Sequence, residues 1–376
     1  MFERSKTDKR RVIIVDMSHL FYKYSYGVST SLSSTIMIDG VPTMVNTTLP
    51  TYTIKQLHRW SLGGYNPLVA CFDGKGSKKS RNYYVLANNL TKEEKYKGNR
   101  PFQDDDFYMG IDITINMLYR GGVTVLKGEN YEADDLIKAA VDKAKIDYPD
   151  LPIDVITGDV DLTPLVDDQV SVFLTSKKTT WAESKDLEKR HYIQLTPYNI
   201  QDYMEGLTEF KNLKLPYNTV LLKKILRGDP SDKICGVAKL TPTKFNKIID
   251  GLIEDGYDLG SICRYDSPTV QYVYKDSGLI IPPEMLNNID VNNVIAQYGE
   301  PPCLTKLKEA LSKYLTPDEV DYASKVYTAI NLNGAFTDVP VEYKRRPASV
   351  KIPIKGYVAS ELQQVVAEVQ INLPIF

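Results

Sequence analysis

The sequence predicts an α/β fold, in which a parallel sheet covered by helices on both faces is followed by a mainly helical unit. Short apolar runs alternate with helical stretches through residues 11–175, the pattern of parallel strands joined by crossover helices. Three of these runs end in an aspartate. After about residue 192 the strand-like runs give way to helical stretches separated by polar, Pro or Gly breaks.

Five apolar runs have the length and composition of buried strands. They span residues 11–16, 67–73, 123–126, 153–159 and 170–174. Ligands of parallel sheets bind beyond the carboxyl ends of the strands. Asp16, Asp73 and Asp159 stand at such ends, so this edge of the sheet is the predicted site.

Apolar residues at helical spacing predict the helices. In the first unit these cover residues 51–60, 105–119 and 132–144, and in the second 199–209, 219–227, 243–252 and 302–314. We expect residues 1–191 to form the first unit, including a basic stretch at 75–107. Residues 192–341 then form the helical unit, and residues 342–376 a linker and a C-terminal tail.

The composition narrows the class of protein. Four cysteines without a CxxC pair and three histidines argue against a zinc site and a disulfide framework. No apolar run reaches the roughly 18 residues of a membrane span, and the charged N-terminus lacks the features of a secretion signal. The expectation is a reduced, cytoplasmic protein without a membrane segment.

The net charge is −2, but basic residues concentrate between residues 75 and 100, where there are eight Lys or Arg and only two Glu. Tyr83, Tyr84 and Tyr96 stand among them. Aromatic side chains interleaved with cations suit single-stranded nucleic acid, through base stacking and phosphate pairing. The alternative is a solvated surface loop.

Nine acidic residues stand at strand ends or at close spacing. They are Asp16, Asp73, Glu132, Asp134, Asp135, Asp159, Asp161, Asp229 and Asp232. If the sheet forms as predicted, the first seven meet at one edge, where they repel each other unless a cation is bound. Oxygen ligands with hardly any His or Cys favour Mg²⁺ or Mn²⁺ over zinc. Each segment alone could equally be an ordinary strand end, helix start or turn.

Four short motifs follow one another along the chain. The first consists of Phe72-Asp-Gly-Lys-Gly76, Arg81 and Tyr96-Lys-Gly-Asn-Arg-Pro101. The other three are Tyr131-Glu-Ala-Asp-Asp135, Thr157-Gly-Asp-Val-Asp161 and the segment from Arg227-Gly-Asp-Pro-Ser-Asp232 to Val237. Together they resemble the motif blocks of the flap endonuclease and 5′→3′ exonuclease family across residues 12–247. The sequence of residues 224–232 is similar to that of phage-encoded members that act as exonuclease and RNase H on replication primers. For such a member the compartment is the host cytoplasm.

The resemblance implies a PIN-like nuclease core with a helical arch, and a helix–three-turn–helix unit near residues 226–250. It also implies two or more Mg²⁺ or Mn²⁺ ions. The first seven acids would hold the metals, with Asp73 and Asp159 catalytic, and Asp229 and Asp232 would reach over from the helical unit, largely through water.

The resemblance also assigns substrate contacts. Lys97 would contact the scissile phosphate and Arg100 the same or a neighbouring one, while Tyr96 would stack on a base. Arg81, Lys239 and Lys244 are further expected substrate contacts. The substrate would be DNA with a 5′ single-stranded flap or end, and also RNA at the 5′ end of an RNA–DNA hybrid.

The sequence departs from the family pattern in three places. Later glycines of the helix–three-turn–helix are replaced by Leu240 and Pro242, and Pro removes a backbone donor for phosphate. Lys233 replaces an expected Asn, and the first block, starting at Asp16, lacks a glycine. None of these changes deletes an expected metal ligand.

Residues 370–376, Gln-Ile-Asn-Leu-Pro-Ile-Phe, are similar to the peptides with which bacterial replication proteins bind the sliding clamp. This predicts a clamp as a partner, unless the tail packs on its own domain. A single-strand-binding protein is a second expected partner.

The leading interpretation is a structure-selective 5′-nuclease of DNA replication or repair that hydrolyses phosphodiester bonds by two-metal-ion catalysis. A PIN-type endoribonuclease is the first alternative, although such enzymes are generally shorter and lack the second helical unit. A non-catalytic flap- or fork-binding module is the second, although it predicts missing ligands. A mononucleotide-binding protein is disfavoured, because Gly74 and Gly76 are too few for a phosphate-cradling loop.

Overall fold

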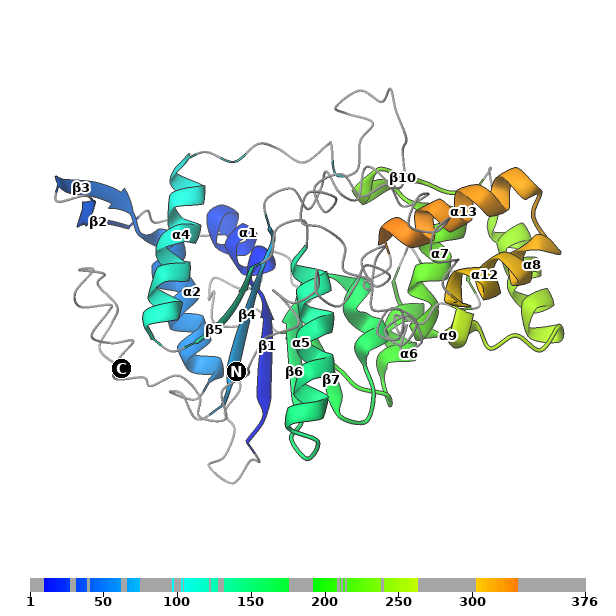
Figure 1. Cartoon of the computed structure of the whole chain (residues 1–376), viewed down its shortest axis with the longest axis horizontal. Helices are drawn as coiled ribbons and strands as arrows, with labels where there is room; N and C mark the ends of the chain where they lie inside the picture. Colours follow the sequence, from blue (N-terminus) through cyan, green and yellow to red (C-terminus); the bar gives the residue numbers. More distant parts are fainter. Residues whose placement is uncertain are drawn as a thin grey trace, which may run out of the picture.

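A six-stranded sheet forms the centre of the protein (Figure 1). The computed structural model describes residues 10–27, 32–38, 41–61, 66–74, 97, 103, 105–121, 123–127, 132–175, 192–207, 210, 212–213, 215–237, 240–262 and 302–330. The strand order is β5-β4-β1-β6-β7-β8. The strands are β1 (Val12–Asp16), β4 (Leu68–Phe72), β5 (Thr124–Lys127), β6 (Ile153–Thr157), β7 (Val170–Thr175) and β8 (Tyr192–Leu195).

The five predicted strands are confirmed, and they pair in parallel. The edge strand β8 was not predicted and runs antiparallel to β7. The sheet is therefore mostly parallel rather than wholly parallel, and it continues past residue 191. The predicted boundary after residue 191 lies directly before β8.

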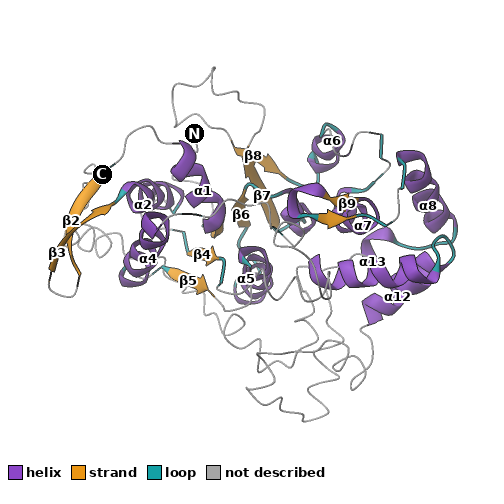
Figure 2. Cartoon of the chain, turned by 90° about the horizontal axis from the view of Figure 1, so that it is seen from above, coloured by secondary structure: helices purple, strands orange, loops and turns teal. Residues whose placement is uncertain are grey.

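Helices cover both faces of the sheet, as predicted (Figure 2). One face packs on α5 (Ala133–Asp147), and the other on α1 (Met17–Gly27), α2 (Thr48–Trp60) and α4 (Asp105–Arg120). In β1, Val12 and Ile14 enter the core on the α5 side, whereas Ile13 and Val15 enter the opposite core. This alternation explains why the strand is apolar at every position, since both of its faces are buried.

The later part of the described chain is mainly helical. It contains α6 (Ile200–Glu205), α7 (Val220–Arg227), α8 (Pro242–Glu254), α9 (Leu259–Ile262), α12 (Pro302–Ser312) and α13 (Pro317–Ile330). Its buried side chains, among them Leu222, Phe245 and Leu311, belong to the same apolar cluster as the α5 face of the sheet. The helical part is therefore packed onto the sheet through one continuous core.

The predicted helices differ from these in detail. The helix expected at residues 199–209 ends at Glu205, and α1, α9 and α13 were not predicted. No helix within the described ranges is long and apolar enough to cross a membrane.

A two-stranded ribbon of β2 (Ser33–Ile38) and β3 (Val41–Asn46) was also missed. It projects from the α2 and α4 side of the protein (Figure 1). The signal for it was present, because Asp39-Gly40 between two β-rich runs is typical of a tight hairpin.

One buried ion pair ties the first strand to its neighbour. Nη1 of Arg11, just before β1, donates to both carboxylate oxygens of Asp154 in β6 at 3.0 Å. The two side chains are only 14% and 5% exposed. Removing one partner of such an ion pair is costly, because the charge of the other partner stays in a poorly solvated place.

We therefore expect Arg11→Met to lower the free energy of unfolding by about 3 kcal/mol, measured by urea denaturation. The matched control is Lys325→Met in the exposed pair with Asp321 on α13, which should change it by less than about 0.5 kcal/mol. Equal effects of the two substitutions would contradict a special contribution of the Arg11 pair.

Candidate metal centre

The acidic side chains gather at the carboxyl edge of the sheet, where the neighbouring strands β4, β1 and β6 end. Asp16 is the last residue of β1, and Asp73 directly follows β4. Asp159 follows the end of β6 by two residues. The parallel order of these strands brings together residues that lie far apart in the sequence.

Asp16 is buried and joined to the turn after β6. Its Oδ1 accepts a hydrogen bond from the backbone N–H of His19 at 3.0 Å, and its Oδ2 accepts from the Thr157 hydroxyl at 2.8 Å. The Thr157 oxygen in turn accepts from the backbone N–H of Asp159 at 3.0 Å. This chain of hydrogen bonds holds the carboxyl ends of β1 and β6 in fixed relation.

Asp73 anchors the helix that carries the other acids. Its Oδ2 accepts from the Ser18 hydroxyl and its Oδ1 from the backbone N–H of Ala133, the first residue of α5, both at 2.8 Å. Glu132 precedes the helix and forms a reciprocal cap with Asp135. Acids at a helix N-terminus are favoured by the helix dipole, so Glu132 and Asp135 also stabilise the start of α5.

His19 was not singled out from the sequence. A Cβ added to Gly158 would lie 2.2 Å from its Nδ1, so the imidazole packs directly on the turn that carries Asp159. Burial, together with Lys23, lowers the pKa of His19 to about 4. The ring is therefore neutral at pH 7 and acts here as a packing surface for the turn.

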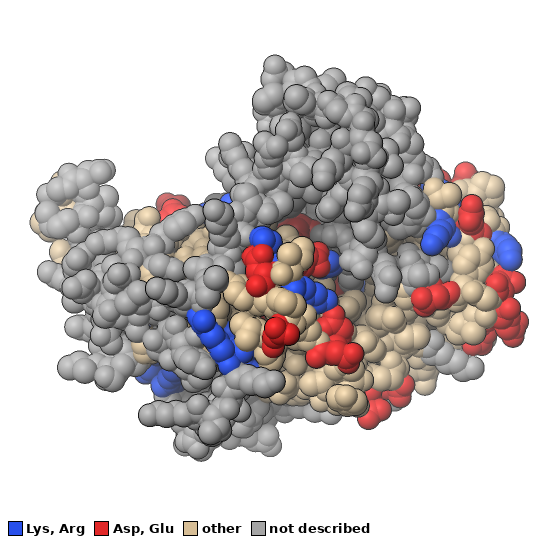
Figure 3. All heavy atoms as spheres, turned by 60° about the horizontal axis from the view of Figure 1, so that its bottom comes forward, with Lys and Arg blue, Asp and Glu red and all other residues tan. Residues whose placement is uncertain are grey.

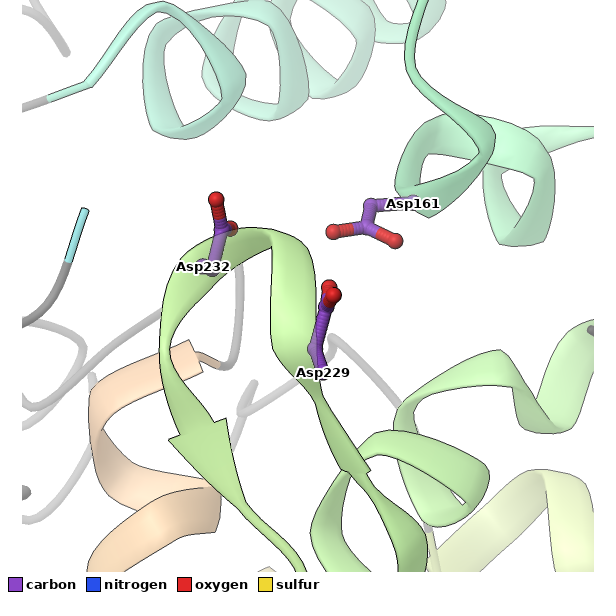
Figure 4. Close-up of side chains that lie close together, drawn as sticks. All are labelled: Asp161, Asp229 and Asp232. Carbon is purple, nitrogen blue, oxygen red and sulfur yellow. The ribbon is translucent and has the colours of Figure 1, made fainter. Parts of the chain in front are cut away.

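A second carboxylate group comes from two segments, the turn after β6 and the turn after α7. Asp161, Asp229 and Asp232 each offer an oxygen atom within 4.8 Å of the others, and Figure 4 shows the side chains converging on one space. Asp161 lies in the 3₁₀ helix η1 (Val160–Leu165), Asp229 in β9 (Gly228–Asp229) and Asp232 in η5 (Pro230–Asp232). Sheet and helical part therefore both contribute.

A tight backbone turn presents Asp229 and Asp232. The strand β9 pairs with β10 (Ile234–Cys235). Gly228 has φ of 77°, and a Cβ there would lie 2.4 Å from the backbone nitrogen of Gly236. Only glycine fits both the dihedral angle and the close approach, which explains the Gly228-Asp229 pair of the motif.

Two lysines lie among the carboxylates of this edge and neutralise part of their charge. The Lys224 ammonium in α7 contacts Asp161 and lies 2.5 Å from Oδ2 of Asp229. The Lys97 ammonium lies 2.8 Å from Oε1 of the buried Glu132. The Lys97 backbone N–H also donates to the carbonyl of Asp232 at 3.1 Å. Lys224 was missed because nothing in its local sequence distinguishes it from other helical lysines.

The carboxylates are crowded electrostatically. Burial raises the pKa of Asp16 to about 7, and the neighbouring Asp73 and Asp159 add to the effect. Burial also raises the pKa of Asp134 well above its ordinary value, again with Asp159 and Asp16 contributing. A cation at this edge would offset both the desolvation and the repulsion.

Asp161 and Asp229 share Lys224, yet their pKa values move in opposite directions. Although the Asp161 side chain is 18% exposed, burial and the nearby Asp159 raise its pKa to about 7 against the attraction of Lys224. For Asp229, burial works against ionisation, but Lys224 and two hydrogen bonds from Ser231 outweigh it and lower the pKa to about 2. The second carboxylate group therefore combines a firmly ionised Asp229 with a more readily protonated Asp161.

All nine predicted acidic ligands lie within the described residues, around this edge and the adjoining turn. Lys97 and Lys244 are also described, and Lys244 is exposed in the first turn of α8. Pro242 is at the start of α8, where a helix makes no use of the missing N–H. Arg81, Tyr96, Arg100, Lys239 and residues 370–376 lie outside the described residues, and so does most of the arch region 75–107.

The described surface seen in Figure 3 carries acidic and basic side chains side by side, without a broad basic patch. The ligand set consists of carboxylate oxygens, with the neutral His19 packed against its turn. Such a set fits a hard divalent cation. The chemistry of the donors therefore agrees with a metal centre at this edge.

Comparison with known proteins gives a match to one family model. Residues 11–191 match the model described as 5′-3′ exonuclease, N-terminal resolvase-like domain.

Several bacterial polymerases are similar over part of the chain. DNA polymerase I of Caldicellulosiruptor bescii is 28% identical over 187 residues, which cover 49% of this chain and 18% of that protein. DNA polymerase I of Mycobacterium bovis is 33% identical over 153 residues, 39% of this chain and 14% of that one. DNA polymerase I of Lactococcus lactis subsp. cremoris is 26% identical over 255 residues, which cover 67% of this chain and 25% of that protein. The chain thus matches a minor part of these longer proteins.

Solved structures include one of the T5 D15 protein co-crystallised with metal ions, with a TM-score of 0.45 and 17% identity over 84% of this chain and 100% of that chain. Human GEN1 in complex with Holliday junction DNA matches with a TM-score of 0.38 and 12% identity, over 81% and 67% of the two chains.

The raised pKa of Asp16 predicts the pH dependence of the metal-free protein. The folded state holds this proton more tightly than the unfolded chain, whose pKa is 3.8. The contribution of Asp16 to the free energy of unfolding therefore falls as the pH rises from about 4 to about 7. Asp16→Asn should remove this loss. In EDTA, the free energy of unfolding of the variant relative to wild type should therefore be higher at pH 8 than at pH 5.

Denaturation in urea at both pH values measures the effect. The exposed Asp168 provides a control, because Asp168→Asn should keep the wild-type pH dependence. An Asp16→Asn variant with the wild-type pH dependence would show that Asp16 is not protonated in the folded protein.

Proposed function

We propose that this chain is a metal-dependent 5′-nuclease, because it belongs through residues 11–191 to the 5′-3′ exonuclease N-terminal resolvase-like domain family. It hydrolyses phosphodiester bonds in DNA that carries a 5′ single-stranded flap or end, and also in RNA at the 5′ end of an RNA–DNA hybrid. The observation that carries the proposal is the convergence of buried, mutually repelling carboxylates on one edge of the sheet.

The carboxylates fall into two sets, one for each of two cations. Asp16, Asp73, Glu132, Asp134, Asp135 and Asp159 would hold one cation, and Asp161, Asp229 and Asp232 a second. Mg²⁺ or Mn²⁺ fits this donor set. When bound, a pair of such ions supplies an activated water and stabilises the leaving oxygen of the phosphodiester.

The chain itself orients these carboxylates before any substrate arrives. Hydrogen bonds from Thr157 and His19 hold Asp16, and those from Ser18 and Ala133 hold Asp73. Preorganised charges lower the barrier because they need no reorientation during the reaction. Asp73 and Asp159, at the ends of β4 and β6, are the proposed catalytic acids.

Lys97 is the proposed contact to the scissile phosphate. Its ammonium lies at the carboxylate edge against Glu132, and its backbone is bonded to Asp232. A buried cation there would offset the negative charge that develops on the phosphate. Arg100 and Arg81 would bind neighbouring phosphates, and Tyr96 would stack on a base.

Lys244, exposed at the start of α8, would bind the phosphates of the duplex together with Lys239. The relatives are DNA polymerases, which agrees with a role in replication or repair. A sliding clamp bound through residues 370–376 and a single-strand-binding protein are the proposed partners, and the host cytoplasm is the proposed compartment.

We expect cleavage of a 5′-labelled flap duplex with Mg²⁺, and no cleavage with EDTA. Asp159→Asn should slow it by roughly a hundredfold or more, since even outer partners of a metal site matter 10–100-fold. The control is Asp168→Asn, which should cleave at the wild-type rate. Binding of the flap duplex without cleavage in both Mg²⁺ and Mn²⁺ would instead favour a non-catalytic flap-binding module.

Lys97→Met should lower the single-turnover rate of cleavage by roughly 10²–10³-fold, because the phosphate loses a positioned charge. Equilibrium binding of Mn²⁺ should remain. The matched control is Lys127→Met, which removes an exposed ammonium at the end of β5 and should leave the rate unchanged. A Lys97→Met variant that cleaves normally would remove this residue from the proposed mechanism.

A further inference from the structure

The strongest feature that the proposed mechanism leaves unused is a lysine inside the second carboxylate group. We propose that Lys224 is an exchangeable counter-ion that occupies this metal position in the metal-free protein and must withdraw when a divalent cation binds there. The inference rests on the proposed function, because it assumes that the carboxylates bind metal.

The contacts place the ammonium between two predicted ligands. It touches Asp161, from the turn after β6, and it lies 2.5 Å from Oδ2 of Asp229, from the turn after α7. The Lys224 side chain is only 9% exposed, and those of Asp161 and Asp229 are 18% and 12% exposed. The ammonium is therefore held by the same carboxylates that converge with Asp232 into a possible cation site.

An ammonium and a divalent cation cannot share these carboxylates at full strength. A cation coordinated by Asp161 and Asp229 would lie next to the ammonium, and like charges repel strongly where little water screens them. The metal must therefore displace Lys224, and the displacement weakens metal binding at this position. In the other carboxylate set, around Asp16 and Asp73, Asp159 also interacts electrostatically with this ammonium, but no direct contact joins the two.

The anchoring of Lys224 allows such a displacement. It lies in the last turn of α7, where the helix dipole favours a cation, and a flexible four-carbon stem connects the ammonium to the backbone. The ammonium can thus leave while α7 stays packed through Leu222, Ile225 and Leu226, which are fully buried.

Lysine labelling of the wild-type full chain gives the direct test. The protein is acetylated with an N-hydroxysuccinimide ester at increasing Mn²⁺, without DNA, and each lysine is quantified by peptide mass spectrometry. We expect labelling of Lys224 to rise several-fold as the weaker class of Mn²⁺ sites fills. Lys223, whose ammonium lies 4.8 Å from the Phe210 ring centroid, is the internal control and should not change. Continued protection of Lys224 with both classes of site filled would overturn the inference.

Calorimetric titration with Mn²⁺ gives a second test. Lys224→Met should tighten one class of sites by about tenfold or more, in the range that neighbours of a metal site exert on affinity, and change the other class much less. Lys223→Met is the matched control on the same helix. An equal effect of both substitutions, or none, would contradict displacement.

Removing Lys224 leaves Asp161 and Asp229 facing each other, so the metal-free variant should melt at a lower temperature than wild type and regain more on addition of Mn²⁺. Lys224→Gln keeps a hydrogen-bond donor without the charge and provides a second variant. The two proposals fail differently. If the wild-type protein binds no Mn²⁺ and does not cleave, the proposed function fails. If it binds and cleaves but Lys224 stays protected, only the counter-ion role fails.

Discussion

The mutual repulsion of carboxylates at one edge of the sheet is the constraint on which the rest of the structure depends. Parallel pairing of β4, β1 and β6 brings Asp16, Asp73 and Asp159 to the same edge. Burial then disfavours the ionised form of Asp16 and raises its pKa to about 7, and the charges of Asp73 and Asp159 add to this effect. Nearby cations reduce this repulsion, and the folded chain supplies two of its own, Lys97 and Lys224.

These lysines also join the helical part to the sheet. Lys224 bridges Asp161 and Asp229, and Lys97 bonds through its side chain to Glu132 and through its backbone to Asp232. One continuous apolar core lies beneath them. The proposed metal centre is therefore a product of the contact between the two parts rather than of either alone.

The hydrogen bonds around the acids show that several ligands have a second task. Asp73 anchors the start of α5, and Glu132 and Asp135 cap it. The plainer interpretation of these residues as helix-start acids is thus correct without excluding a role at the metal. A single set of carboxylates can fix the backbone and leave oxygen atoms for a cation, because each carboxylate has several lone pairs.

The sequence by itself determined the parallel strands, three of the helices that cover them (α2, α4 and α5) and the position of every acidic candidate ligand. These follow from local apolar periodicity and from short motifs, which a single segment contains in full. It did not yield α1, β8, α13 or the ribbon of β2 and β3, although Asp39-Gly40 signalled that ribbon.

Only the tertiary structure decided which charges lie together. Lys224 is an ordinary helical lysine in the sequence, and His19 an ordinary residue after a strand. Their environments arise from segments far apart in the chain, since Lys224 meets Asp161 across 63 positions. Burial and charge pairing depend on such long-range contacts, whereas periodicity depends on neighbours. The sequence therefore determined the ligands, and the folded chain decided their counter-ions.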